Sequence, residues 1–141
     1  MAEKSNRIYK YGEQPIRITT VQVVEKQFEG AATVKQVDDY LRTLFPHYRD
    51  NTRSNLVINT VNCNRSHWDC NKVARRSDDV THRYHEYDRL FKRGNIFEIY
   101  QPTLHGIWEI YQDLQGKWCY RQVKSTIEQA VEAAAKLYPS K

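Results

Sequence analysis

"DNTRSNLVINTVNCNRSH", residues 50–67, combines the apolar spacing of a helix with an unusual number of asparagines. The apolar residues that recur at helical spacing are Leu56, Val57, Ile58 and Val61. Asp50 or Asn51 is a good N-cap, so we predict a helix from there to about Asn64. Asparagine is a poor helix former because its short amide competes for nearby backbone groups, yet this stretch contains five. The amides are therefore expected to serve a ligand rather than the helix.

Four of these amides share one side of the predicted helix. At about 100° per residue, Asn51, Asn55, Asn59 and Asn62 fall within an arc of about 80°. An asparagine side chain has one acceptor and two donors, and it can pair with the major-groove edge of adenine. The pattern favours contact with DNA bases. The alternative is that these are ordinary surface residues and that Asn51 only caps the helix.

Two more helices are predicted before this stretch. Capping boxes mark their starts, Thr19 with Gln22 and Thr33 with Gln36. Gly30 can close the first helix, and Pro46 stops the second. After the third helix, "RLFKRGNIFEIYQ" (residues 89–101) contains two apolar-aromatic runs around Arg93-Gly94-Asn95, which is typical of a β-hairpin. Three helices and a hairpin are the order of a winged helix-turn-helix, in which the third helix enters the major groove.

The C-terminal part predicts an extension of this fold. A second hairpin is expected from "GIWEIYQ" (residues 106–112) and "KWCYRQV" (residues 117–123), followed by a helix over residues 125–138. The long polar segment over residues 65–88 is expected to be a functional loop. We therefore predict an α+β fold with a polar N-terminal arm over residues 1–15. A single winged-helix-like domain with its C-terminal extension would occupy residues 16–141.

Composition limits the possible classes of protein. The 141 residues carry a net charge of +5, and 40% are hydrophobic, which fits a globular domain with a core of its own. No apolar run is long enough to span a bilayer and no secretory leader is recognisable, so a cytoplasmic protein without a membrane partner is expected. Three cysteines, an odd number, favour reduced thiols over disulfides.

Positive charge gathers around the predicted third helix and hairpin, which favours a DNA partner. The asparagines would read bases, and the basic residues would hold phosphates. The candidate DNA-binding residues are Thr52, Arg53, Asn55, Asn59, Asn62, Arg65, Arg75, Arg76, Lys92 and Arg93.

Two runs resemble a known kind of domain: "FPHYRDNTRSNLVINTVNCN" (residues 45–64) and "YDRLFKRGNIFEIYQPTLHGIWEI" (residues 87–110). The shared features are a Thr opening the third helix, a Leu-Phe-x-Arg-Gly hairpin and a following His-Gly-x-Trp. Over about residues 18–110 the chain is similar to bacterial winged-helix domains of uncharacterised function, which occur alone or appended to restriction and HNH-type nucleases. The resemblance implies DNA binding in restriction, defence or transcription control. Where the family pattern has a second glycine in the hairpin, this chain has Asn95-Ile96.

A zinc site is a second hypothesis. Cys63, His67 and Cys70, with His82 further along, could supply the four ligands of a tetrahedral site, although the spacing is not that of a common zinc finger. The alternative is that the thiols are half-buried and the histidines lie near phosphate. We expect no cofactor.

Catalysis is a third hypothesis. Asp113 and Gln122-x-Lys124, with Glu98 or Glu109, faintly resemble a Mg²⁺-dependent nuclease core, but the hairpin between them is short and solvated turn residues are expected. We therefore expect no enzymatic activity.

A rival function is protein interaction, as an accessory or inhibitor protein. The aromatic residues of the second hairpin would then form the partner surface: Trp108, Tyr111, Trp118 and Tyr120. A homodimer and a nuclease partner both remain open.

Overall fold

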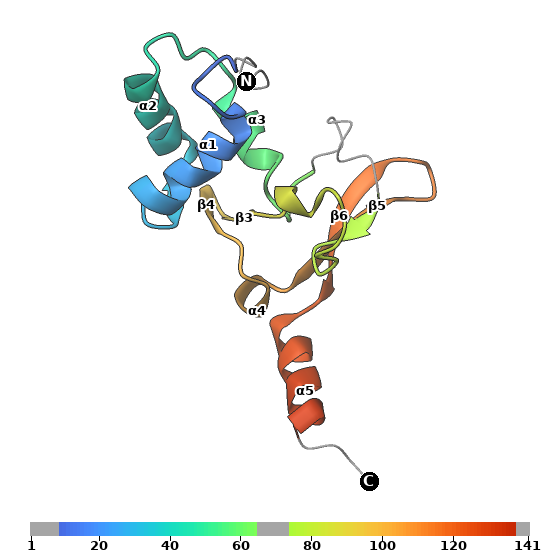
Figure 1. The fold of residues 1–141 in the computed structure, drawn as a ribbon. Coiled ribbons are helices and arrows are strands. Elements are labelled where there is room, and N and C mark those ends of the chain that lie inside the picture. The colour runs from blue at the N-terminus through green and yellow to red at the C-terminus, as the bar shows by residue number, and fades with distance from the viewer. Residues whose placement is uncertain (1–8, 65–73, 138–141) are drawn as a thin grey trace, which may run out of the picture.

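The computed structural model describes residues 9–64 and 74–137. The first half of the chain is mainly helical (Figure 1): α1 Ile16–Gln22, the π-helical turn η2 Val23–Gln27, β1 Ala31–Thr33, α2 Val34–Leu44 and α3 Thr52–Val57. The second half is mainly β-structure: β2 Arg75–Arg76, the 3-10 turn η4 His85–Tyr87, β3 Leu90–Arg93, β4 Ile96–Ile99, α4 Pro102–His105, β5 Ile107–Gln112, β6 Trp118–Lys124 and α5 Thr126–Leu137. The fold is therefore α+β, as predicted, with two small antiparallel sheets.

The first helix begins earlier than predicted. Pro15 occupies the N-cap, and its carbonyl accepts from the N–H groups of Ile18 and Thr19. Thr19 lies inside the helix, where its hydroxyl accepts from the Gln14 amide, so the predicted capping box at Thr19 is wrong. Gly30, with φ of +101°, ends the segment as predicted, and its N–H donates back to the Val24 carbonyl.

The capping box of α2 is confirmed. The Thr33 hydroxyl accepts from the Gln36 N–H at 3.2 Å, and the Gln36 side chain accepts from the Thr33 N–H at 2.9 Å. These bonds satisfy two of the backbone groups that a helix start leaves without a partner. The helix ends at Leu44, shortly before Pro46.

The third helix starts as predicted but ends much sooner. Asn51 is its N-cap and accepts from the Ser54 N–H at 3.0 Å. The helix stops at Val57, not near Asn64. Beyond it the chain runs beside β3: the Asn59 carbonyl accepts from Arg89 and Leu90, and Val61 donates to Leu90. Pairing with a strand therefore replaces further turns of helix.

Both predicted hairpins are present, and each belongs to a three-stranded sheet. In the first sheet, with strand order β1-β4-β3, the hairpin β3–β4 is joined by β1, whose Ala31 lies opposite Glu98. In the second sheet, β5 and β6 form the hairpin, and Arg75 of β2 lies opposite Ile110. The sequence did not predict β1, β2 or α4.

The main core lies between α1, α2, α3 and the first sheet. Its most deeply buried residues include Val21, Val24, Val37, Leu41, Leu56, Leu90 and Phe97. Tyr11, expected in an N-terminal arm, belongs to this core: it lies between Phe45 and Tyr48, at ring distances of 5.8 and 5.1 Å. Its hydroxyl accepts from the Arg49 N–H, so the expected separate arm does not extend through Tyr11.

The C-terminal helix α5 extends away from the rest of the molecule (Figure 1). The helix predicted over residues 125–138 is confirmed, and its start is capped: the Ser125 hydroxyl accepts from the Glu128 N–H, and the Glu128 carboxylate accepts from the Ser125 N–H. None of its residues is buried, and Ile127 is 74% exposed. Within residues 9–64 and 74–137, no helix combines the length and apolar character needed to cross a membrane.

Candidate nucleic-acid interface

Three of the four asparagines predicted to face a ligand, Asn55, Asn59 and Asn62, bind other groups of the protein, and the fourth caps α3. Asn59 is 1% exposed, and its amide donates to the carbonyls of Arg17 at 3.1 Å and Asn55 at 2.8 Å. An asparagine amide has two N–H donors, so both are used. Asn55 is buried, with its amide 3.5 Å from the Asp50 carboxylate.

Asn62 binds the hairpin instead of solvent. Its side chain accepts from the Lys92 N–H and donates to the Lys92 carbonyl, both at 2.8 Å. The expectation of an outward amide stripe is therefore wrong. The 100° spacing requires a continuous helix, and α3 ends at Val57, so the later amides satisfy backbone groups of neighbouring segments.

Thr52 is also a structural residue rather than an exposed contact. Its hydroxyl donates to Asp38 at 2.6 Å, and it therefore accepts from the Tyr48 hydroxyl at 2.6 Å. Partial burial raises the pKa of Asp38, but hydrogen bonds from Arg42 and Thr52 outweigh it and hold this pKa below its usual range. This series of hydrogen bonds joins α2 to the start of α3, because Asp38 lies in α2 and Thr52 is the first residue of α3.

Arg75 and Arg76, in the polar segment over residues 65–88, are both paired with carboxylates. The Arg75 side chain is 1% exposed and donates to Asp88 at 3.1 Å, so its assignment to a phosphate is wrong. Burial requires such a charge to be paired, and the partner here is internal. Arg76 pairs with Asp78 at 2.9 Å, and its hydrogen bond lowers the pKa of that carboxyl. Arg65 lies outside the described residues.

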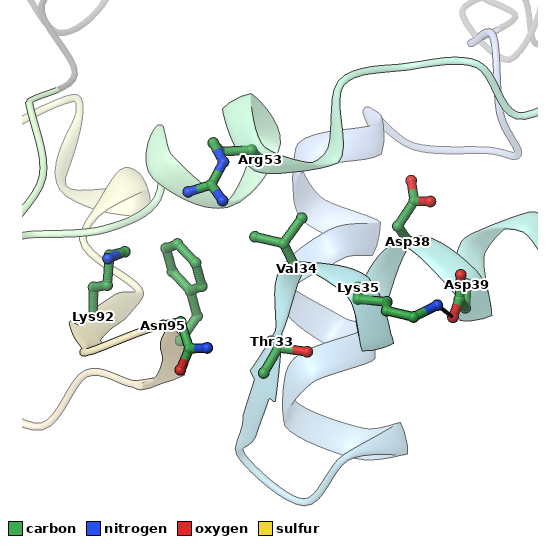
Figure 2. A pocket seen from close by; sticks show the side chains of 9 residues that line it. Thr33, Val34, Lys35, Asp38, Asp39, Arg53, Lys92 and Asn95 are labelled. Carbon is green, nitrogen blue, oxygen red and sulfur yellow. Dashed lines mark hydrogen bonds and ion pairs between the residues drawn. The ribbon is translucent and has the colours of Figure 1, made fainter.

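Arg53 and Lys92 do come together. They lie on the same side of a surface depression of about 730 Å³, with Asn95 beside them (Figure 2). Arg53 comes from the exposed side of α3, whereas Lys92 and Asn95 come from the hairpin. Residues 33–35, at the start of α2, form the adjoining wall, and Phe97 also lines the depression.

Acidic residues occupy the other side of the depression, but each has a basic partner. Lys35 pairs with Asp39 at 2.9 Å and Arg42 pairs with Asp38 at 2.8 Å. No described residue forms a hydrogen bond or an ion pair with the Arg53 side chain. Among the cations that line the depression, Arg53 and Lys92 have no ion pair with a described residue, whereas Lys35 is paired.

Arg93, at the end of β3, is exposed but paired. It lies 3.0 Å from Glu98 of β4, and Glu98 also binds the buried His105 at 2.5 Å. The hydrogen bond from Arg93 lowers the pKa of Glu98; partial burial opposes this effect, and the bond to His105 adds to it. A phosphate would have to share Arg93 with this carboxylate.

Sequence reasoning missed part of this depression. The lining residues that the predicted DNA-binding set did not include are Thr33, Val34, Lys35, Asp38, Asp39, Asn95 and Phe97. Strand β1 brings the start of α2 next to the hairpin, because Thr33 lies opposite Ile96. A strand of three residues is too short to show a periodic pattern, so the sequence carries no clear signal of this neighbourhood.

The zinc hypothesis stays a prediction, because His67 and Cys70 lie outside the described residues. Cys63 is half-buried, and the Nδ1 atom of His82 accepts from the Tyr84 N–H at 3.1 Å. In the part of the chain that the structure describes, no three His, Cys, Asp or Glu residues are grouped as metal ligands.

The residues of the weak nuclease pattern each have a structural bond. The Asp113 carboxylate accepts from the N–H groups of Lys117 and Gln115, which lower its pKa and close the β5–β6 turn. Gln122 donates to the His105 carbonyl at 3.2 Å, and Lys124 pairs with Glu132 of α5 at 2.8 Å.

The aromatic residues of the second hairpin are mostly half-buried. The Trp108 indole donates to the His105 carbonyl at 2.8 Å, and its ring lies 5.9 Å from that of Phe91. Arg121 covers Tyr111 at 4.1 Å, and Tyr120 is 41% exposed. The bond of Trp108 joins the hairpin to α4, and its ring contact with Phe91 joins the hairpin to β3.

Comparison with known proteins yields no match among family models, curated proteins or solved structures.

Proposed function

We propose that the protein is a winged-helix domain that binds double-stranded DNA and catalyses no reaction. In this proposal α3 and the hairpin β3–β4 face the duplex, as the recognition helix and the wing do in that fold. The order of three helices and a hairpin supports it. Strand β1 gives further support, since it pairs with β4 and so places the hairpin beside the helices. A role in restriction, defence or transcription control is part of the same proposal.

The observation that carries the proposal is the shared depression of Arg53 and Lys92. The two cations come from the two elements that a winged helix applies to DNA. Lys92 uses one of its three amine hydrogens on the Gly94 carbonyl, which leaves two for a phosphate. The net charge of +5 would favour the encounter with a polyanion. Among the candidates that the structure describes, Arg53 and Lys92 form the proposed DNA-contacting set, with Arg93 at its margin. Arg65, which lies outside the described residues, stays a prediction.

A titration of a fluorescently labelled duplex, followed by anisotropy at low salt, tests this proposal. We expect binding that weakens as salt rises, because each phosphate contact releases counterions. The double variant Arg53→Glu, Lys92→Glu should lose at least about tenfold in affinity, since two attractions become repulsions.

Lys26→Glu is the matched control. Lys26 is exposed and lines a different depression, with Tyr40 and Leu44, so this change should cause a smaller loss. Equal losses in the control and the double variant would contradict the proposed surface. Absence of binding by the unaltered protein would contradict DNA binding itself.

The rival function, protein interaction through the second hairpin, has less support. Trp108, Tyr111 and Trp118 are half-buried, and Trp108 and Tyr111 are held by internal contacts. Interface anchors are more often aromatic side chains that a partner can enclose.

A further inference from the structure

Asn59 and Asn62, the two amides that follow α3, bind the protein's own backbone. Asn59 donates both amide hydrogens to carbonyls, and Asn62 both donates to and accepts from Lys92. Turning either side chain toward DNA would leave backbone groups of Arg17, Asn55 or Lys92 without these partners. The side chains best suited to reading adenine are therefore not available to a duplex.

The exposed surface of α3 is short and offers few hydrogen-bond donors. A helix of six residues is about 9 Å long, less than two turns. The N-cap Asn51 is exposed, but its side-chain oxygen is occupied by the Ser54 N–H. Within α3, Arg53 is the exposed side chain with the reach to touch DNA, and the structure places it beside Lys92.

Two cations that converge on one depression suit a phosphate better than a base edge. Recognition of guanine uses the two parallel donors of one arginine, whereas a phosphate accepts from several donors at once. Lys92 adds a point charge from a different element, and the Lys92 backbone is fixed by Asn62. Asn62, which is not available to read a base, thus fixes the backbone from which the Lys92 side chain extends.

We infer that the protein binds duplex DNA through the phosphates of the DNA, with an affinity that varies little with base sequence. This inference rests on the proposed function and specifies its ligand as the sugar-phosphate backbone of a duplex. Asn59 and Asn62 act as positioning residues for the surface and make no contact with DNA.

The test compares three labelled duplexes of equal length, one with only A·T pairs, one with only G·C pairs and one of mixed sequence. We expect dissociation constants within about threefold of one another, in contrast to the roughly thousandfold or larger preference of specific readers. Arg53→Ala should weaken binding to all three by the same factor and reduce the salt slope by about one. Lys26→Ala is the matched control, with a smaller change expected.

The outcomes separate this inference from the proposed function. A preference above about threefold for one duplex would overturn backbone recognition while leaving DNA binding intact. A loss of affinity in Arg53→Ala that is confined to one duplex would do the same. Failure of all three duplexes to bind would overturn the proposed function and this inference with it. Because Arg53 is exposed, circular dichroism of the variant should match that of the unaltered protein.

Discussion

At the scale of single residues, one directed chain of hydrogen bonds joins three elements of the second half. The Gly106 carbonyl can only accept, so the Tyr100 hydroxyl donates to it. The Ser77 hydroxyl must then donate to Tyr100, at 2.7 Å, and it accepts from the Trp108 N–H at 2.9 Å. The chain connects the end of β4 to the segment after β2 and to the start of β5. Every hydroxyl hydrogen in it has one possible direction.

Tyr100 should make the protein sensitive to alkali. Burial raises the pKa of Tyr100 to about 12, above its ordinary value of 10.0. The unfolded chain therefore releases this proton first, and the stabilisation present below pH 10 is lost between about pH 10 and 12. The loss is about 1.4 kcal/mol per pH unit within that window. Tyr100→Phe lacks this group, so urea unfolding at pH 9, 10 and 11 should show a steeper decline for the unaltered protein. Parallel declines would contradict the assignment.

At the scale of elements, the start of β5 depends on a glycine packed against β6. Gly106 has φ of +88°, and an added Cβ would lie 2.8 Å from the Lys124 carbonyl oxygen. The same Cβ would lie 2.3 Å from the amide nitrogen of Gln122. The Gln122 side chain can move, but the backbone of β6 cannot without disturbing its pairing with β5.

Gly106→Ala should therefore lower the free energy of unfolding by more than about 2 kcal/mol, through both strain and contact. Gly94 is the matched comparison, because it has φ of +62° and no atom within 4 Å of an added Cβ. Gly94→Ala should cost about 1 kcal/mol, from the backbone conformation alone. Chemical denaturation of the two variants measures the difference. Similar losses in both would show that the contact with β6 adds nothing.

Elements with strong local patterns could be predicted from sequence. The cap of α2, the turn around Gly94 and the cap of α5 depend on residues within a few positions of one another. The end of α3 could not be predicted, because Asn59 and Val61 pair with a strand about thirty residues later. The short strand β1 was missed for the same reason: only its partner β4 makes it a strand.

At the scale of the whole molecule, the candidate site also has features that the sequence predicts and features that depend on distant segments. Arg53 and Lys92 could be proposed from charge and position, and the structure places them together. Whether an asparagine faces solvent depends on distant segments, such as the Arg17 carbonyl that receives the Asn59 amide. Arg75 likewise became internal through Asp88, a partner thirteen positions away that no periodicity identifies. The sequence thus predicted which residues carry charge, but it did not predict which polar and charged side chains, such as Asn59 and Arg75, are buried.

Removal of α5 should leave the remaining fold nearly as stable, although this helix is one of the longest elements of the described structure. Its residues are not buried, and Val131 is 63% exposed. Besides the cap bonds with Ser125, the described side-chain bonds lost with it are the exposed pair of Lys124 with Glu132 and the bond from Gln129 to the Pro102 carbonyl. Such contacts contribute about 0–1 kcal/mol each. A chain ending at Ser125 should therefore lose less than about 2 kcal/mol in urea unfolding.

Leu41→Ala provides the comparison for this truncation. Leu41 is 0% exposed in the main core, so the variant should lose about 2–5 kcal/mol. The truncated chain should also lose helical circular dichroism without a matching fall in its urea midpoint. A loss from truncation as large as that from Leu41→Ala would contradict the expectation. It would mean that the stability of the second sheet depends on α5, although the side chains of this helix are exposed.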